Sequence, residues 1–174
     1  SPLILVTALC VKLSSPGPIF YGQDRIGRDG VRFRTWKFRP MLRNADELLE
    51  LYLDQDPVLR EQWERERKLN GDPRVIPGIG RILRRTSMDE LPQLWNVLRG
   101  EMSLVGARPL PDYHLDHFDA EFRQYRQQVR PGVTGLWQVM GRRNGRDESY
   151  LRWDVDYVRN WSHKLDGLIL LRTL

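Results

Sequence analysis

The sequence contains a single cysteine, Cys10, among its 174 residues. One thiol excludes an intrachain disulfide and any metal site built from cysteines alone, and it is typical of a protein that faces a reducing compartment. No apolar run reaches the ~20 residues that a helix needs to cross a bilayer, which argues against a polytopic membrane bundle. With 40% hydrophobic and 29% charged residues, a chain of this length is expected to fold around one core.

Acidic residues are the minority, 23 against 28 basic residues, and the net charge of +5 gives an isoelectric point near 9.6. This excess favours anionic partners: phosphate groups, nucleic acid or an acidic membrane surface. Between residues 25 and 43 the only acid is Asp29, against seven basic residues: Arg25, Arg28, Arg32, Arg34, Lys37, Arg39 and Arg43. Such a run is either a phosphate-binding surface or a solvated sheet face.

The longest stretch poor in charge lies near the N-terminus, where Lys12 is the only charged residue between Pro2 and Leu13. It predicts a short apolar helix, either buried in the core or in contact with a membrane. Two extended segments flank the turn signal at residues 28–30 and predict a β-hairpin. Helical spacing between residues 44 and 70 predicts two helices, which Pro57 divides.

The C-terminal part alternates between helical and glycine-rich segments. Residues 114–129 and 148–162 have the spacing of amphipathic helices. Residues 130–145 between them predict a loop or a short strand. The tail at 164–174 is apolar on most sides, so it either continues the core or lies on a membrane.

Residues 86–100 carry the clearest local motif. Ser87 and Glu90 have the S-x-x-E spacing of a capping box, which predicts a helix beginning near Ser87. Pro92 fits better if the helix begins later, with Asp89 as the cap and Pro92 in the first turn. In either register the helix is expected to bury its apolar side chains, Leu91, Leu94, Trp95 and Leu98.

Asp89 and Glu90 follow three basic residues, Arg81, Arg84 and Arg85. A carboxylate can attack phosphorus to form an acyl phosphate, and a second carboxylate can hold Mg²⁺ against phosphate charge. Acids in the first turn of a helix are, however, more often caps. Arg108 could likewise clamp a phosphate or pair with an acid. The residues alone therefore indicate a basic, phosphate-binding α/β domain.

Four segments, taken in order, resemble the bacterial sugar transferase family, the monotopic polyprenyl-phosphate phosphoglycosyl transferases. They are SPGPIFYGQDRIGRDGVRFRTWKFRPM, DPRVIPGIGRILRRTSMDELPQLWNVLRGEMSLVGARP, VRPGVTGLWQVMGR and DVDYVRNWSHKLDGLILLRT. The resemblance runs from Ser1 to Leu174, and TSMDELPQLWNVLRGEMSLVG is its most specific part. Two positions depart from the family pattern: Pro40 in FRPM and Ala107 in VGARP.

The resemblance implies transfer of a hexose-1-phosphate from a UDP-sugar to undecaprenyl (polyprenyl) phosphate, with release of UMP. This step begins the synthesis of exopolysaccharide, capsule, O-antigen and hence lipopolysaccharide. By carry-over Asp89 is the nucleophile that forms a phosphosugar–aspartyl intermediate, and Glu90 assists it with Mg²⁺, so both are metal ligands. The other residues carried over bind substrate: Lys37, Arg84, Arg108, Arg142 and Asp154. The acid-rich helices at 45–70 resemble the galactose and glucose branch.

The implied fold class is α/β, of the α+β kind: a small, helix-rich, monotopic membrane-associated domain with a short β-hairpin and amphipathic interfacial helices. Residues 1–13 would be the returning half of a re-entrant membrane helix broken at Ser1-Pro2, so the protein is expected to extend upstream. Residues 14–174 would form the catalytic domain on the cytoplasmic face of the inner membrane. The expected partners are the UDP-sugar, undecaprenyl phosphate and membrane lipid, with homo-oligomerisation left open and nucleic acid excluded.

Two other classes of function fit parts of the sequence. Residues 81–100 could form a helix–turn–helix whose phosphate contacts come from the hairpin arginines, and salt-sensitive binding to duplex DNA would reveal it. Alternatively, the apolar ends could make the chain a membrane-surface adaptor without chemistry. An adaptor would bind anionic vesicles and leave every UDP-sugar unchanged.

Overall fold

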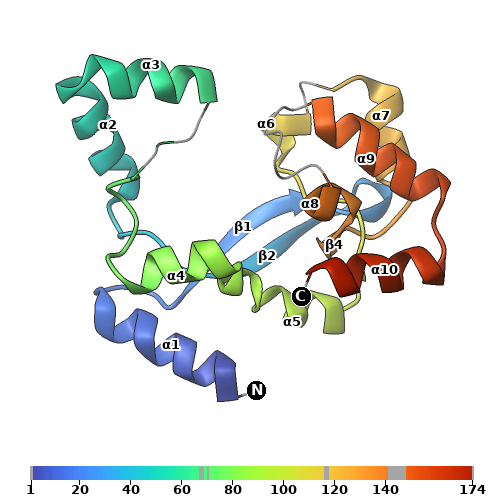
Figure 1. Ribbon diagram of the computed structural model, residues 1–174, viewed down its shortest axis with the longest axis horizontal. Helices are drawn as coiled ribbons and strands as arrows, with labels where there is room; N and C mark the ends of the chain where they lie inside the picture. Colours follow the sequence, from blue (N-terminus) through green and yellow to red (C-terminus); the bar gives the residue numbers. More distant parts are fainter. Residues whose placement is uncertain (1, 67–68, 70, 116–117, 141–147, 174) are drawn as a thin grey trace. The chain divides into compact units, whose positions relative to one another are not determined.

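The computed structural model describes residues 2–66, 69, 71–115, 118–140 and 148–173. Its helices and two small sheets confirm the mixed α/β fold class (Figure 1). The chain forms two compact units, one from Ser1–Tyr21 with Lys37–Leu91 and one from Gly22–Trp36 with Pro92–Leu174. None of the described helices combines the length and the apolar character needed to cross a bilayer.

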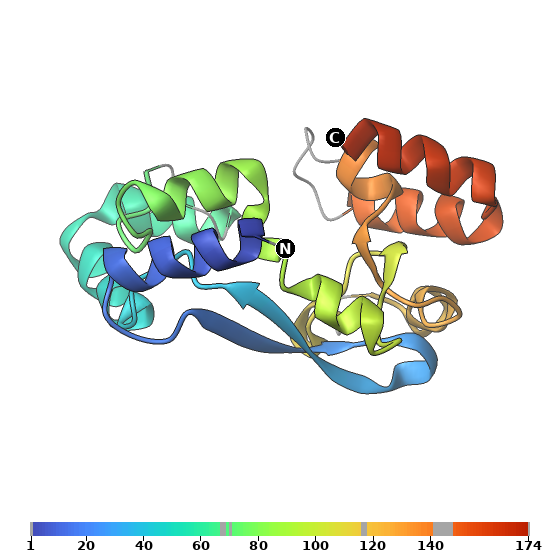
Figure 2. The same cartoon turned by 90° about the horizontal axis from the view of Figure 1, so that it is seen from below.

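In the first unit, α1 (Pro2–Ser14) confirms the predicted N-terminal helix and lies alongside α4 (Ile79–Thr86), as Figure 2 shows. Their shared core consists of Val11, Phe38 and Leu83, all fully buried. The side chains of Leu5, Leu9 and Leu13 on α1 are exposed. One face of the helix therefore packs on the core, while several large apolar side chains on the rest of its surface are exposed.

The two helices α2 (Ala45–Gln55) and α3 (Pro57–Glu66) confirm the division predicted at Pro57. Asp56 caps α3, since its Oδ1 accepts hydrogen bonds from the amides of Val58 at 2.9 Å and Leu59 at 3.2 Å. Pro57 occupies the first helical position, where proline needs no amide proton. These helices pack their own small core around Leu49, Leu53 and Leu69.

Strands β1 (Phe20–Ile26) and β2 (Arg32–Phe38) pair as the predicted hairpin. A 3₁₀ turn, η1 (Arg28–Gly30), joins them. Asp29 and Gly30 adopt the left-handed conformation there, with φ of 55° and 75°. Aspartate and glycine are residues that tolerate this conformation, which explains why the turn signal was readable from the sequence.

The second unit is built around a short parallel sheet. Strand β3 (Ser103–Val105) pairs with β4 (Gly132–Thr134), so that Ser103 lies opposite Gly132 and Val105 opposite Thr134. Its helices are α5 (Gln93–Leu98), α6 (Asp112–Leu115), α7 (Ala120–Arg126), α8 (Leu136–Met140), α9 (Glu148–Arg159) and α10 (His163–Thr173). α8 packs on both α9 and α10, and Val105, Tyr157 and Ile169 form the core.

The C-terminal expectations are mostly confirmed. The predicted helix at 148–162 is α9, and the predicted loop or strand contains β4 and α8. The predicted helix at 114–129 is shorter, because Asp119 caps α7 through the amide of Phe122 at 2.7 Å. The tail forms α10, which buries Ile169 and exposes Leu168 and Leu171.

The predicted capping box at Ser87 is wrong. Ser87 has φ of 57° and ends α4 in the left-handed conformation, and its side chain caps no helix. A single 3₁₀ turn, η2 (Met88–Glu90), follows, and α5 begins only after Pro92. A capping serine normally has an extended backbone, so the left-handed Ser87 does not place its side chain over the amides of the next turn.

Of the predicted buried side chains, Leu91 packs on the core of the first unit, but the prediction is wrong for Leu94, Trp95 and Leu98. Gln93 and Asn96 are buried, whereas the side chain of Trp95 is 57% and that of Leu98 80% exposed. Asn96 explains the inversion: its Nδ2 donates to the carbonyl of Arg34 and to Glu101, both at 2.7 Å, and its Oδ1 accepts from the amide of Trp36. This network holds the polar face of α5 inward.

Candidate functional site

The acid pair lies in η2, the turn that follows α4 in the first unit. The amide of Glu90 bonds to the carbonyl of Ser87 at 3.1 Å, and that of Leu91 to Met88 at 3.2 Å. The side chains of Met88 and Leu91 pack on the core formed with α1 and α4. Apolar neighbours thus anchor the turn, while the carboxylates of Asp89 and Glu90 remain partly exposed.

Lys37, near the end of β2, reaches the acid pair. Its Nζ lies 2.7 Å from Oε1 of Glu90, although 53 residues separate the two in sequence. The side chains are only 20% and 15% exposed, so this charge-assisted hydrogen bond is partly shielded from water. The structure therefore brings together three of the predicted site residues: Lys37, Asp89 and Glu90.

Arg84 on α4 belongs to a neighbouring ionic cluster. Its Nη1 lies 3.6 Å from Oδ2 of Asp72, which Arg74 binds with two hydrogen bonds of 2.8 Å. The side chains of Asp72 and Arg74 are nearly buried. Burial by itself raises the pKa of Asp72, but hydrogen bonds from Arg74 and the charges of both arginines hold that pKa below its usual 3.8.

The Asp72 cluster predicts a pH-dependent stability. A lowered folded pKa means that ionised Asp72 stabilises the fold above pH ~4 and that this stabilisation is lost as the pH falls through the folded pKa. Asp72→Asn is therefore expected to lower Tm at pH 7, by several degrees, and to differ less from the parent chain at pH 3. Thermal unfolding from pH 7 to 3 measures this, with the exposed Asp29→Asn as control. A Tm difference that stays constant over this range would contradict the assignment.

Arg39, one of the basic residues of the hairpin segment, is not part of a phosphate-binding surface. Its side chain is buried and donates to the carbonyls of Pro18 at 2.7 Å, Ser15 at 2.9 Å and Met41 at 3.1 Å. Burial lowers its pKa. The guanidinium therefore clamps the turn after α1 onto the end of β2, next to Lys37. No local signal in the sequence separates this arginine from its exposed neighbours.

Glycines bring the VGARP and RPGVTG motifs together in the second unit. A Cβ at Gly106 would lie 2.5 Å from the carbonyl oxygen of Arg130, and one at Gly132 would lie 2.1 Å from the amide nitrogen of Gly106. Backbone hydrogen bonds of 2.9 Å join Gly106 to Thr134 and Gly132 to Ala107. Only residues without a side chain permit this approach.

Arg108 and Asp154 belong to the second unit. Asp154 on α9 is buried and accepts a 2.8 Å hydrogen bond from Nε of Arg126 on α7. Burial raises the pKa of Asp154, and the charges of Arg126 and Arg108 partly oppose that rise. The guanidinium of Arg108 lies 5.7 Å from the ring centre of Trp137. Sequence reasoning missed Arg126, whose side chain is buried against Asp154.

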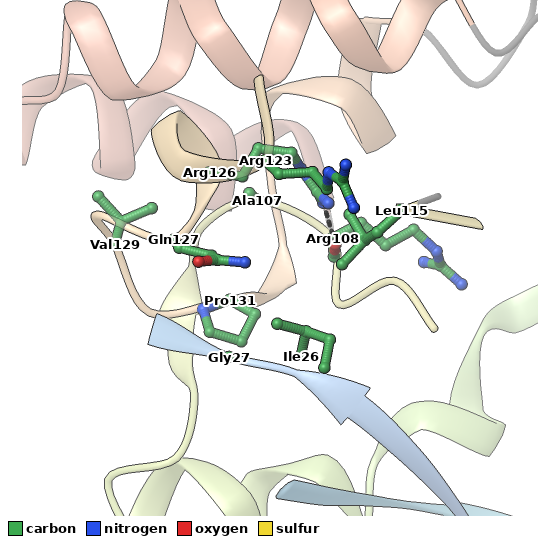
Figure 3. A pocket seen from close by; sticks show the side chains of 10 residues that line it. All are labelled: Ile26, Gly27, Ala107, Arg108, Leu115, Arg123, Arg126, Gln127, Val129 and Pro131. Carbon is green, nitrogen blue, oxygen red and sulfur yellow. Dashed lines mark hydrogen bonds between the residues drawn. The ribbon is translucent and has the colours of Figure 1, made fainter. Parts of the chain in front are cut away.

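A small pocket that is open to solvent adjoins this cluster. Figure 3 shows Arg108, Arg123 and Arg126 along one side of it, and Ile26 and Gly27 of the hairpin opposite. Ala107 also lines the pocket, so the departure from the family pattern at this position lies in its wall. Arg142 lies outside the described residues.

The acid pair offers oxygen donors for a divalent cation. Mg²⁺ commonly binds proteins through one or two carboxylates and completes its shell with water and substrate phosphates. Asp89 and Glu90 fit that requirement. Within the described ranges, no group of three or more His, Cys, Asp or Glu side chains is placed to hold a metal. Any Mg²⁺ at Asp89 and Glu90 would therefore need further ligands from substrate or solvent.

Comparison with known proteins gives consistent matches over the whole chain. The family model described as bacterial sugar transferase matches residues 1–174. The chain is 44% identical over 174 residues to the exopolysaccharide production protein ExoY of Sinorhizobium fredii, of which it covers 76%. It is 46% identical over 173 residues to the UDP-galactose-lipid carrier transferase of Erwinia amylovora. It is 45% identical over 157 residues to the undecaprenyl-phosphate galactose phosphotransferase of Salmonella typhimurium.

These relatives differ in length. The alignments include 99% of this chain for the Erwinia amylovora protein and 90% for the Salmonella typhimurium protein. They span only 36% and 33% of those two proteins.

Proposed function

The chain belongs to the bacterial sugar transferase family, and we propose that it transfers a hexose-1-phosphate from a UDP-sugar to undecaprenyl phosphate. The relatives support both substrates, since their names include a UDP-galactose-lipid carrier transferase and an undecaprenyl-phosphate galactose phosphotransferase. The observation that carries the proposal is the anchored turn that presents Asp89 beside Glu90, with Lys37 bound to Glu90 at 2.7 Å. The product would begin the synthesis of an exopolysaccharide or a related surface glycan.

In the first step, the carboxylate of Asp89 attacks the phosphorus that carries the sugar. A bond forms between a carboxylate oxygen and phosphorus, the bond from that phosphorus to the bridging oxygen breaks, and UMP leaves with the bridging oxygen. The sugar phosphate is then an acyl phosphate on Asp89. In the second step, an oxygen of undecaprenyl phosphate attacks the same phosphorus and releases Asp89.

The remaining site residues are proposed to bind the metal ion and the substrate phosphates. Glu90, held by Lys37, is proposed to bind Mg²⁺ together with Asp89. The ion, when bound, neutralises charge on the transferred phosphate. Arg84, Arg108 and Arg142 are proposed to bind substrate phosphates, since guanidinium groups match phosphate oxygens in pairs.

The test uses the purified chain with Mg²⁺ and a panel of UDP-sugars that includes UDP-glucose and UDP-galactose. UMP is quantified, and intact-mass spectrometry detects a sugar-phosphate adduct. An adduct with one donor supports the two-step reaction and identifies the sugar. Release of UMP only in the presence of undecaprenyl phosphate, with no adduct under any condition, would contradict the covalent step.

Exposed apolar helix faces support the proposed location at the inner membrane. That the catalytic residues face the cytoplasm is proposed from the family resemblance alone. In the first unit α1 exposes leucines, and in the second unit α5 exposes Trp95 and Leu98 and α10 exposes Leu168 and Leu171. Helices with an apolar face of this kind bind in the interfacial layer of a bilayer.

Leu98→Asp is expected to weaken binding to vesicles that contain phosphatidylglycerol by about tenfold, because it removes one large apolar contact and adds a negative charge. Vesicle flotation measures the bound fraction. Val58→Asp on the acid-rich α3 is the matched control, since Val58 is 73% exposed but lies outside these faces. Equal losses in both variants would contradict the docking of α5.

A further inference from the structure

Arg126 links three segments of the second unit through one buried guanidinium. Its Nε donates to Oδ2 of Asp154 on α9 at 2.8 Å, and its Nη2 donates to the main-chain carbonyl of Arg108. The side chain of Arg126 is 7% exposed and that of Asp154 only 2%. Figure 3 shows Arg126 and Arg108 joined at the rim of the pocket.

The hydrogen bond from Arg126 involves the main-chain carbonyl of Arg108 and not its guanidinium. The carbonyl of Arg108 is fixed by Arg126, while the preceding residues are fixed by the backbone contacts between Gly106 and Gly132. Because the main chain is held at Arg108 and just before it, the Cα of Arg108 has a defined position. Its side chain extends from there beside Trp137. Its charge also reaches Asp154, where it opposes part of the rise in pKa that burial causes.

We propose that Arg126 is a positioning residue for Arg108 and that Asp154 acts only through Arg126, as the buried anion that holds this guanidinium. This inference rests on the proposed function, in which Arg108 binds a donor phosphate. By resemblance Asp154 would bind the substrate directly. Its carboxylate is only 2% exposed and is bonded to Arg126, so in this proposal it acts on the substrate only through Arg126.

The test is a cycle of single and double variants, with UDP as the ligand and calorimetry as the readout. Arg126→Lys keeps the positive charge but cannot donate to Asp154 and Arg108 with the same fork. It is expected to weaken UDP binding about tenfold and to lower kcat/KM by up to about 100-fold, since small displacements of a binding group have such effects. The exposed Arg152→Lys on α9 is the control and should change neither value.

The decisive comparison is Arg126→Lys in the background of Arg108→Gln. If Arg126 acts through Arg108, the second substitution adds no further loss of UDP affinity, so the two effects are not additive. Additive losses would overturn the positioning role and leave the proposed function intact. Unchanged UDP affinity in Arg108→Gln alone would overturn it as well. Absence of UMP release from the parent chain with every donor would instead contradict the proposed function.

A structural role alone predicts a different pattern. Loss of fold would lower the melting temperature and reduce the fraction of active protein, with KM unchanged. Arg126→Lys is therefore also measured for Tm and for its KM and kcat separately. A raised KM in a variant that melts within a few degrees of the parent chain supports positioning, and a lower kcat at unchanged KM contradicts it. Asp154→Asn should show the same KM effect if it acts through Arg126.

Discussion

Asp89→Asn is expected to abolish UMP release, with a loss of at least ~10³-fold in kcat, while the chain remains folded. The amide has nearly the shape of the carboxylate but is no nucleophile toward phosphorus, so the acyl phosphate cannot form. The fold should survive because Met88 and Leu91, and the backbone bonds of η2, anchor this turn. Intact-mass spectrometry with a UDP-hexose should accordingly show the sugar-phosphate adduct on the parent chain only.

Glu90→Gln is the matched variant for this experiment. It keeps the size of the side chain and removes the charge that Lys37 contacts at 2.7 Å. If Glu90 assists through charge, the variant should form the adduct slowly, and if Asp89 is the nucleophile, only Asp89→Asn should lose it completely. UMP release at the parent rate in Asp89→Asn would refute the proposed mechanism. Loss of the adduct in Glu90→Gln but not in Asp89→Asn would identify Glu90 as the nucleophile instead.

The same measurement separates the three classes of function that the sequence allows. An adaptor without chemistry would produce no UMP from any donor. A helix–turn–helix module needs a recognition helix after Ser87, whereas α5 has six residues and exposes Trp95 and Leu98 instead of polar side chains. Membership of the bacterial sugar transferase family agrees with the transferase and with neither of these two alternatives.

Local signals predicted the elements that depend on local chemistry. The apolar run after Pro2, the turn residues at Asp29 and Gly30, and the position of Pro57 each fix the backbone of their own segment. The corresponding helix, hairpin and helix boundary are all present. The acid pair Asp89 and Glu90 was singled out from the residues themselves, and the resemblance to a known family gave the pair its role and added Lys37. The structure brings these three together in the first unit.

The errors arise where distant residues decide. Asn96 is buried because the backbone of β2, some 60 residues earlier, offers it a hydrogen-bond acceptor and a donor. These bonds bury the polar face of α5 and expose its apolar face. Ser87 looks like a cap in one dimension, yet the end of α4 places it in the left-handed conformation. Arg126 was missed because an arginine at helical spacing looks exposed until Asp154 on another helix is placed beside it. The Asn96 and Arg126 errors both depend on a polar contact between separate elements, which hydrophobic periodicity does not detect.

Gly132→Ala is expected to lower the free energy of unfolding by about 3 kcal/mol, because the added Cβ would meet atoms that cannot move independently. It would lie 2.1 Å from the amide nitrogen of Gly106, directly after β3, and 2.3 Å from the carbonyl oxygen of Thr134 in β4 itself. A flexible side chain could turn away from such a contact, but these backbone atoms move only if the main chain of both segments shifts. Urea denaturation of the whole chain measures the change.

Gly167→Ala is the control for Gly132→Ala, because it makes the same chemical change where no atom lies within 4 Å of the added Cβ. Gly167 is inside α10, where alanine is favoured over glycine by about 0.5–1 kcal/mol, so this variant should be slightly more stable than the parent chain. The opposite signs separate steric overlap from any general effect of alanine. Equal stability of the two variants would mean that β3 and β4 can part without cost. Since Arg108 directly follows this contact, Gly132→Ala should also weaken UDP binding, whereas Gly167→Ala should not.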